Sequence, residues 1–353
     1  MWKTIRIIVQ AIVAAGLIAL LAWLAHKYDV VARLKTIDRR YLGLALVVIF
    51  ISTFINTIRW FLLLQNVGIR RSVLSLWPLY LIGLFFSQFL PTGTGGDAVR
   101  IFEVARRSGK TAGAVMAVLQ ERVFGLGISM LLGLFATSYY WDRIPANLRI
   151  WVLLIQIAGP SGLLVFLYPH FFIRMMHRLL GSRADKLMRI LQPVLDLPKL
   201  SPARLLSVAV VTAIGVIVSC LVYAILARAL KIEVSLLGFI LAVPLGWVIK
   251  MAPISLGGIG LAEGTLIVAL GLLFDIEKEP ATALAFVYLG LTILAALSGG
   301  VLVAIRMATG TWIPPKSAST SAVASGDLVI PNYAAASRDS VGSSDPESVK
   351  GPS

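Results

Sequence analysis

Charged residues are scarce in this sequence, at 14% of its 353 residues against 58% hydrophobic residues. Soluble domains contain about 25% charged residues, so the composition predicts a polytopic membrane protein. The formal net charge of +15 comes from short basic clusters between apolar runs, which is typical of cytoplasmic loops beside anionic lipid. A nucleic-acid partner is not expected, because there is no soluble basic domain to bind one.

Cysteine and histidine are also rare. The single cysteine, Cys220, lies in an apolar run and has no second cysteine with which to form an intramolecular disulfide. The three histidines, His26, His170 and His177, show no HExxH or other metal-ligand spacing. We therefore expect no metal and no other cofactor, and the sequence gives no support to a redox or zinc enzyme.

Long apolar segments dominate what is present. The first, residues 5–25, is about 20 residues long, which is enough to span a bilayer and longer than the roughly 7–15-residue core of a signal peptide. We interpret it as an uncleaved first helix. Further apolar segments cover residues 41–64, 76–90, 123–140, 149–168, 204–229, 234–249, 265–274 and 281–305. Together they predict an all-α membrane bundle of about seven to nine apolar segments.

Two other segments differ in composition. Residues 170–200 alternate apolar and basic residues at helical spacing, as does a helix lying in the headgroup layer; a cytoplasmic helical hairpin packed on the protein fits equally well. Residues 308–353 are rich in Ser, Ala, Gly and Pro, which predicts a disordered cytoplasmic or surface tail. The remaining residues, 1–307, form the expected transmembrane domain.

Two apolar runs are interrupted by the same pattern, P-x-x-x-G-G. It reads PTGTGG at residues 91–96 and PISLGG at residues 253–258. Paired Pro/Gly interruptions in two halves of a membrane protein indicate internal repeats, with a substrate site where the broken, re-entrant segments meet. Tight interfacial turns are the alternative interpretation. The residues expected to break the helices are Pro91, Gly95, Gly96, Pro253, Gly257, Gly258 and Gly260.

Charged side chains lie within or beside these apolar runs. A charge at the bilayer centre costs about 2.5–3.5 kcal/mol on the insertion scale, so each needs a partner or a function. Arginines and the free N–H groups of a helix N-terminus suit an anionic headgroup. The alternatives are a structural ion pair at Glu121–Arg122 and snorkelling at Arg59, Arg106 and Arg107. The candidate headgroup residues are Arg59, Asp97, Arg100, Glu103, Glu121, Arg122, Lys250 and Glu263.

Loop charges allow two topologies. If residues 76–90 re-enter without crossing, the N-terminus is cytoplasmic; if they cross, it is outside. The positive-inside rule accepts both, and the shortness of 76–90 favours re-entry. Residues 98–122 and 169–204 are cytoplasmic in either arrangement.

The stretches LPTGTGGDAVR, AVLQERVFGLG and PISLGGIGLAEG together resemble the flippase-like family, the transmembrane region of lysylphosphatidylglycerol synthases, which also occurs as stand-alone proteins. The resemblance covers about residues 5–307. Matching positions include Arg59-Trp60 and Ser255, which joins the candidate site on this ground. Members often have an arginine shortly after an ALA…Y stretch, where this chain has Leu289.

The resemblance implies a helical bundle with internal repeats and re-entrant segments that translocates or handles lipids. It does not extend to aminoacyl transfer, because a short tail stands where bifunctional members have a soluble transferase domain. Relatives imply an anionic phospholipid, glycolipid or hopanoid-type lipid in the cell membrane, and envelope or lipid biosynthesis enzymes as partners.

We therefore expect a lipid transporter rather than an enzyme. Two alternatives stay open. One is a membrane-embedded transferase that acts on a lipid-linked substrate, with Asp97, Glu103 or Glu263 as base or metal ligand. The other is a non-catalytic scaffold for a biosynthetic enzyme.

Overall fold

The computed structural model describes residues 37–89, 95–169, 171, 200–250 and 260–311. Apart from Phe171, these belong to one compact unit formed by residues 1–169 and 198–314. The predicted first helix at 5–25 and the basic segment at 170–200 lie outside the described residues, except for Phe171 and Leu200. The predicted tail does so from residue 312 onwards. These three predictions stay predictions.

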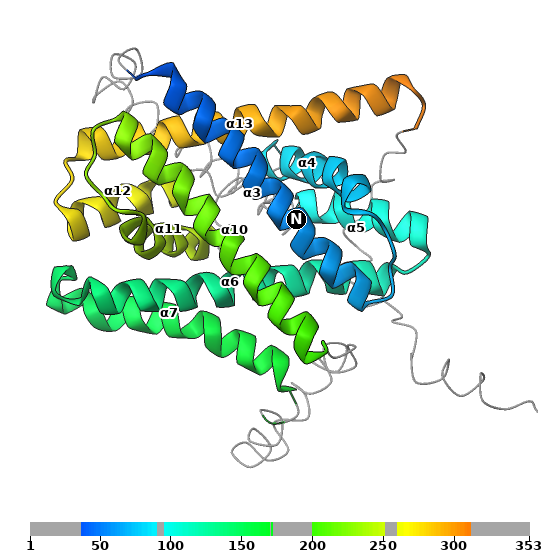
Figure 1. The fold of residues 1–353 in the computed structure, drawn as a ribbon, viewed down its shortest axis with the longest axis horizontal. Coiled ribbons are helices and arrows are strands. Elements are labelled where there is room, and N and C mark those ends of the chain that lie inside the picture. The colour runs from blue at the N-terminus through cyan, green and yellow to red at the C-terminus, as the bar shows by residue number, and fades with distance from the viewer. Residues whose placement is uncertain (1–36, 90–94, 170, 172–199, 251–259, 312–353) are drawn as a thin grey trace, which may run out of the picture. The chain divides into compact units, whose positions relative to one another are not determined.

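The described part of the chain is helical and contains no strand, which confirms the predicted all-α membrane bundle (Figure 1). Among the described residues, five helices are long and apolar enough to cross a membrane. They are α3 (Arg39–Asn66), α6 (Thr111–Tyr139), α7 (Ala146–Leu167), α10 (Pro202–Ala229) and α13 (Lys278–Ala308). The shorter helices are α4 (Val73–Phe89), α5 (Gly95–Ser108), α11 (Leu236–Lys250) and α12 (Leu261–Phe274), and a 3-10 turn, η1, covers Trp141–Arg143.

Polar side chains fix where several helices begin. The Asp38 carboxylate accepts a hydrogen bond from the Arg40 N–H at 2.9 Å at the start of α3. Ser201 caps α10 in the same way, with Pro202 in the first turn, where its missing N–H costs nothing. Gly260 precedes α12 with φ +89°, a backbone conformation that favours glycine.

The helices form two series with the same order of lengths. α3, α4, α5 and α6 have 28, 17, 14 and 29 residues. α10, α11, α12 and α13 have 28, 15, 14 and 31 residues. This long–short–short–long pattern confirms the two internally similar halves, with α7 between them.

The first helices of the two series run antiparallel and side by side (Figure 1). At one end Arg204 donates to Asn66 at 3.1 Å. Nearer the middle, the hydroxyl oxygens of Ser52 and Ser219 lie 2.8 Å apart. Residue numbers rise along α3 as they fall along α10, so the two halves are inverted with respect to each other.

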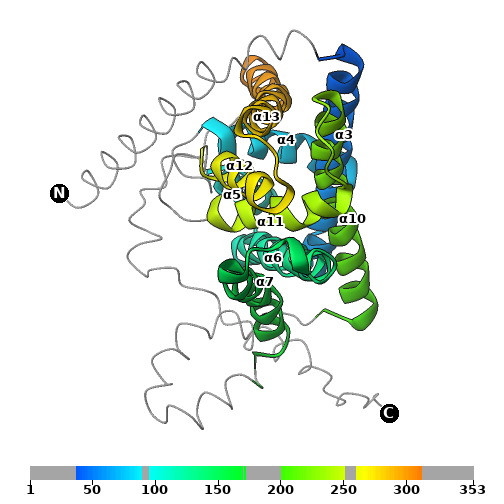
Figure 2. The same ribbon diagram turned by 90° about the vertical axis from the view of Figure 1, so that its left-hand side faces the viewer.

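Each series contains a pair of short helices that begins and ends at the same end of the bundle. Before α4, the Gly68 carbonyl accepts from Lys110 Nζ at 3.0 Å, and Lys110 directly precedes α6. Before α11, the hydroxyls of Ser235 and Tyr140 lie 2.7 Å apart, and Tyr140 also packs edge-on against Phe274 at the end of α12. Figure 2 shows α4, α11 and α12 between α13 and α6.

Two glycines allow these layers to approach closely. A Cβ at Gly96 would collide with the Gly83 carbonyl, so α5 can begin against α4 only without a side chain there. A Cβ at Gly299 would collide with the Leu81 carbonyl, which brings α13 against the other side of α4. The predicted break residues Gly95 and Gly96 are the first two residues of α5.

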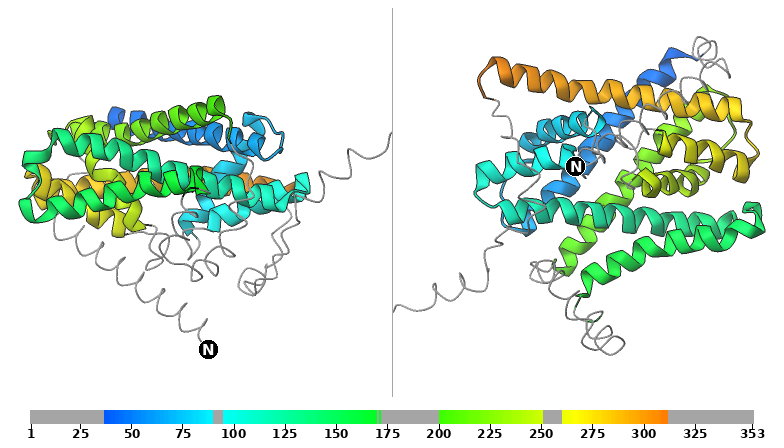
Figure 3. Two further views of the ribbon diagram at one scale, coloured as in Figure 1. Left: turned by 90° about the horizontal axis from the view of Figure 1, so that it is seen from below. Right: turned by 180° about the vertical axis from the view of Figure 1, so that it is seen from behind.

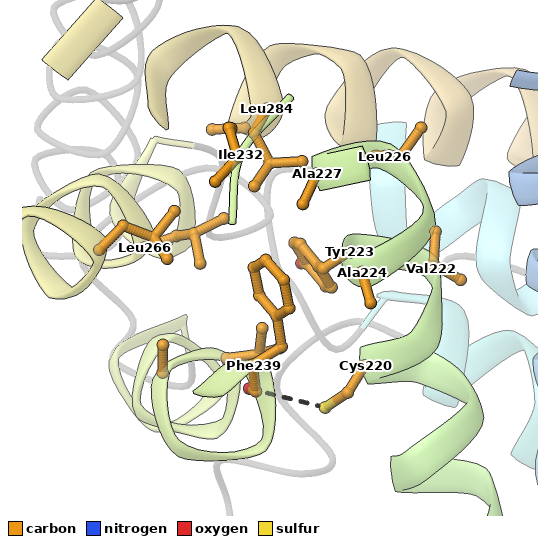
Figure 4. Packing of buried hydrophobic residues seen from close by; sticks show 14 of the residues in the cluster. Cys220, Val222, Tyr223, Ala224, Leu226, Ala227, Ile232, Phe239, Leu266 and Leu284 are labelled. Carbon is orange, nitrogen blue, oxygen red and sulfur yellow. Dashed lines mark hydrogen bonds between the residues drawn. The ribbon is translucent and has the colours of Figure 1, made fainter. Parts of the chain in front are cut away.

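The largest apolar core among the described residues lies mainly in the second half and includes Cys220, Tyr223 and Phe239 (Figure 4). The Cys220 thiol donates to the Phe239 carbonyl at 3.7 Å. The Tyr223 ring stacks on that of Tyr288 with centroids 4.0 Å apart. α7 packs mainly beside α6 (Figure 3) and exposes most of its apolar side chains, as expected for a helix that faces lipid.

One predicted boundary is wrong. The span predicted at 123–140 begins instead at Thr111, so Glu121 and Arg122 lie inside α6 and do not open it. The small residues at 111–119 continue the apolar helix, and the two charges are accommodated because they have partners on neighbouring helices.

Candidate functional site

A cavity of about 330 Å³ lies between helices of both halves. Its wall is formed by side chains from α3, α4, α5, α6, α10 and α11. The polar and charged residues that line it are Asn56, Arg59, Tyr80, Ser87, Gln88, Asp97, Arg100, Glu121, Arg122, Ser129 and Ser219. Among the described residues, the charged groups of the cavity all come from the first half.

Glu121 is the centre of the charge network. One carboxylate oxygen accepts from Arg59 at 3.1 Å and from the Tyr80 hydroxyl at 3.0 Å. The other accepts from Arg100 at 2.8 Å. The Glu121 side chain is 5% exposed, so these donors take the place of water around a buried charge.

Asp97 joins the network from the first turn of α5. One of its oxygens accepts from Arg100 at 2.5 Å, and the other accepts from Arg122 Nε at 2.9 Å and from the Nη2 of the same guanidinium. A carboxylate in the first turn also interacts favourably with the helix dipole. Arg100 therefore bridges the two carboxylates, and α5 is tied to α6 by charge.

Aromatic rings hold Arg100 in place. Its guanidinium carbon lies 4.9 Å from the centroid of the Trp60 ring and 4.6 Å from that of Tyr80. Desolvated cation–π contacts of this kind contribute about 2 kcal/mol. Gly83 provides the space, since a Cβ there would lie 2.8 Å from Arg100 Cγ.

The network carries an excess of positive charge. Arg59, Arg100 and Arg122 face two carboxylates, which leaves one formal positive charge at the cavity. Arg59 Nε is buried with no hydrogen-bond partner among the described residues, and the Arg122 side chain is 43% exposed. The site therefore has spare N–H donors for an anion with acceptor oxygens.

The structure brings together five of the candidate residues: Arg59, Asp97, Arg100, Glu121 and Arg122. Glu103 lies elsewhere, paired with Arg106 and Arg107. Glu263 is not among the described residues that line the cavity; its carboxylate accepts from the Gly260 N–H at 2.7 Å at the start of α12.

The remaining candidates are Pro91 of the first break and residues in or beside the second break. Pro91, Pro253, Ser255, Gly257 and Gly258 lie outside the described residues. Lys250 is the last residue of α11. In the described part, α11 contributes Trp247 to the cavity and α10 contributes Gly215, Val216 and Ser219, so the described residues of the second half reach the site without a charged side chain.

Sequence reasoning missed Tyr80 and Trp247. Tyr80 lies in the apolar run of α4, where one hydroxyl gives no periodic signal, and its partner Glu121 is 41 positions away. Trp247 likewise follows an apolar run in α11. A polar tip within a membrane-depth apolar run is the one sequence feature that points to Tyr80.

Comparison with known proteins agrees with this architecture. No curated protein matches the chain significantly. The family model described as the lysylphosphatidylglycerol synthase TM region matches residues 7–300, which include all of the cavity residues. The protein is a multi-pass membrane protein associated with lipid handling. The chain therefore belongs to the family of the lysylphosphatidylglycerol synthase transmembrane region.

Proposed function

We propose that this protein translocates lipids between leaflets and holds an anionic headgroup in the cavity between α3, α4, α5 and α6. The observation that carries the proposal is the buried cluster of three arginines around two carboxylates. Charges at membrane depth are costly and are kept for binding or transport. Their net charge of one positive unit complements a headgroup with one negative charge, such as a phosphodiester.

Arg122 and Arg59 are the residues that would take the headgroup. Arg122 is partly exposed, so its guanidinium can release the Asp97 carboxylate and bind a phosphate without becoming more buried. Arg59 adds the unpaired Nε. Arg100 packs on Trp60 and is hydrogen-bonded to the carboxylates of Glu121 and Asp97. It therefore holds the charged side chains of the cavity in position. The N-terminus of α5 adds partial positive charge.

The inverted halves support a transport cycle. In such proteins, rocking of one half against the other exposes a central site to either side in turn. We propose that α4–α5 and α11–α12 are re-entrant pairs, because each begins and ends at one end of the bundle. The bounds of the transmembrane domain remain those expected from the sequence, residues 1–307.

We propose the orientation expected from the loop charges of the sequence, with residues 98–122 and 169–204 on the cytoplasmic side of the cell membrane. Arg70, Arg71, Lys110 and Arg204 lie at that end, where α3 ends and α6 and α10 begin. Arg100, Glu121 and Arg122 of the first segment extend into the cavity. In this orientation residues 76–90 re-enter the membrane without crossing it.

Leaflet transfer in reconstituted vesicles tests the function. Vesicles of phosphatidylcholine would carry labelled phosphatidylglycerol or labelled phosphatidylcholine, and a membrane-impermeant quencher would report the outer-leaflet fraction. We expect faster transfer of the anionic lipid, and at least tenfold slower transfer in Arg122→Gln, which is roughly the loss of one charge-assisted contact. The exposed Arg39→Gln, at the start of α3, is the matched control.

Two results would contradict the proposal. If each lipid changes leaflet at the same rate in vesicles with and without the protein, translocation of these lipids would be excluded. Unchanged transfer in Arg122→Gln would exclude the cavity as the headgroup site. A new product formed from a lipid-linked donor, seen by mass spectrometry, would favour the transferase alternative.

A further inference from the structure

A second group of arginines lies at the other end of α5, away from the cavity. The Glu103 carboxylate, whose side chain is 1% exposed, accepts from Arg106 at 3.3 and 3.4 Å. Arg107 Nε lies 3.4 Å from the same carboxylate. These contacts are longer than usual charge-assisted hydrogen bonds of about 2.7–2.9 Å, so the arginines are held loosely.

Arg306 joins this group from α13. Val99 of α5 and Val303 of α13 share a small apolar cluster, and both helices continue in the same direction for one turn to Glu103 and Arg306. Arg306 lies within electrostatic reach of Glu103, Arg106 and Arg107. Its Nη1 is buried and has no hydrogen-bond partner in the described part of the chain.

The charges of this group are not balanced. Three guanidinium groups face one carboxylate, an excess of two positive charges, whereas the cavity has an excess of one. Arginine in the last turn of a helix interacts favourably with the helix dipole, which explains exposed guanidiniums at these ends. It does not explain a buried N–H without an acceptor, because such a group is costly unless an acceptor arrives.

Exposed apolar side chains lie near Arg306 along α13. Val301, Ile305 and Met307 of α13 are 59%, 54% and 60% exposed, and α13 is one of the helices long enough to span the membrane. Arg306 lies two residues before the end of that helix. Arginines at the end of a span, beside exposed apolar side chains, are the surroundings that a lipid headgroup and its acyl chains need.

We propose that Arg106, Arg107 and Arg306 form a second binding site, separate from the cavity, for the phosphate group of an anionic lipid at the membrane surface. Glu103 positions Arg106 and Arg107 and does not touch the lipid. The phosphate oxygens accept from Arg306 Nη1 and from the exposed faces of Arg106 and Arg107. The proposal depends on the membrane placement of α13 and not on transport through the cavity.

Native mass spectrometry of the full-length protein, released from nanodiscs, tests this site. The probes are phosphatidylglycerol, phosphatidylcholine and inorganic phosphate, and the variants are Arg306→Gln, the double variant Arg106→Gln/Arg107→Gln, and Arg39→Gln as control. We expect retention of phosphatidylglycerol over phosphatidylcholine. Affinity for one bound phosphatidylglycerol should fall at least tenfold in both site variants, about the effect of one lost charge-assisted contact, and stay unchanged in the control.

The two anion sites can be separated by their variants. Arg122→Gln should leave the lipid at the α5–α13 site bound, and Arg306→Gln should leave leaflet transfer measurable, so each proposal can fail alone. Arg306→Lys keeps the charge and should restore part of the binding, which a merely misfolded variant would not do. Equal lipid retention in Arg306→Gln, or displacement by inorganic phosphate with no preference for phosphatidylglycerol, would overturn the proposal of a lipid site.

Discussion

Asp97 and Glu263 occupy the same place in the two inverted halves, since each is the third residue of the second short helix of its series. Their surroundings differ. Asp97 is bound by Arg100 and Arg122, whereas Glu263 caps its own helix through the Gly260 N–H. The correspondence extends to α6 and α13, where Glu121 and Tyr288 are each the eleventh residue. In its described residues, the second half therefore repeats the helices that frame the site but not the ion pairs.

Removal of the central carboxylate should destabilise the protein strongly. Glu121→Gln leaves Arg59 and Arg100 buried with an unbalanced charge, and breaking a buried pair in this way costs about 3–5 kcal/mol. The loss can be measured as a fall in the thermal unfolding midpoint in detergent. Glu277→Gln, at an exposed position directly before α13, is the control. A midpoint equal to that of the control would show that the network does not stabilise the fold.

A methyl group at Gly96 should displace α5. Gly96→Ala would put its Cβ against the Gly83 carbonyl, a backbone atom that cannot move aside cheaply, and overpacking of this kind costs about 1–3 kcal/mol. Gly290→Ala, in the interior of α13 with nothing within 4 Å, should be neutral or slightly stabilising because alanine favours helix. Folded yield by size-exclusion chromatography compares the two. Equal yields would mean that α5 does not begin against α4.

Loss of the Asp97 charge should tighten anion binding and slow release. Asp97→Asn raises the excess positive charge at the cavity from one to two and frees Arg122 from its partner. We expect at least about tenfold tighter binding of phosphatidylglycerol together with slower leaflet transfer, as measured by native mass spectrometry and the vesicle assay. Weaker binding would show instead that Asp97 acts mainly to orient Arg122.

A disulfide should join the two halves. The hydroxyl oxygens of Ser52 and Ser219 are 2.8 Å apart, so Ser52→Cys/Ser219→Cys, in a Cys220→Ala background, should oxidise readily. Proteolysis between the halves followed by non-reducing electrophoresis would detect the link. The pair Ser52→Cys/Ser207→Cys, from the middle of α3 and near the start of α10, should not cross-link. Linkage of the control pair alone would contradict the inverted arrangement.

Composition and apolar runs were sufficient to predict the membrane class and the helices. The paired P-x-x-x-G-G breaks also predicted the repeat, because glycine and proline interrupt a helix through their own backbone properties and can be recognised without knowing their contacts. The run at 41–64 lies within α3, and that at 281–305 within α13. The predicted span at 123–140 begins too late, since α6 starts at Thr111 and the charges of Glu121 and Arg122 lower the hydropathy before residue 123. A hydropathy value depends only on the residue type, so it does not show that Glu121 has charged partners on α3 and α5.

The pairings within the site could not be predicted for a related reason. Glu121 meets Arg59 across 62 positions and Tyr80 across 41, and such contacts depend on how helices cross. Five candidate residues converge on the cavity, but Glu263 was expected to share it with Arg100. In the structure the second half turns Trp247 towards the cavity instead.

The inverted halves also give the molecule a direction. A symmetric frame would present the same chemistry to lipids arriving from either leaflet. Among the described residues the ion pairs of the cavity belong to the first half, while the corresponding place in the second half holds Tyr223 stacked on Tyr288. Under the proposed transport function, a headgroup therefore meets charged side chains against one half and aromatic rings against the other, so forward and backward passage need not be equally fast.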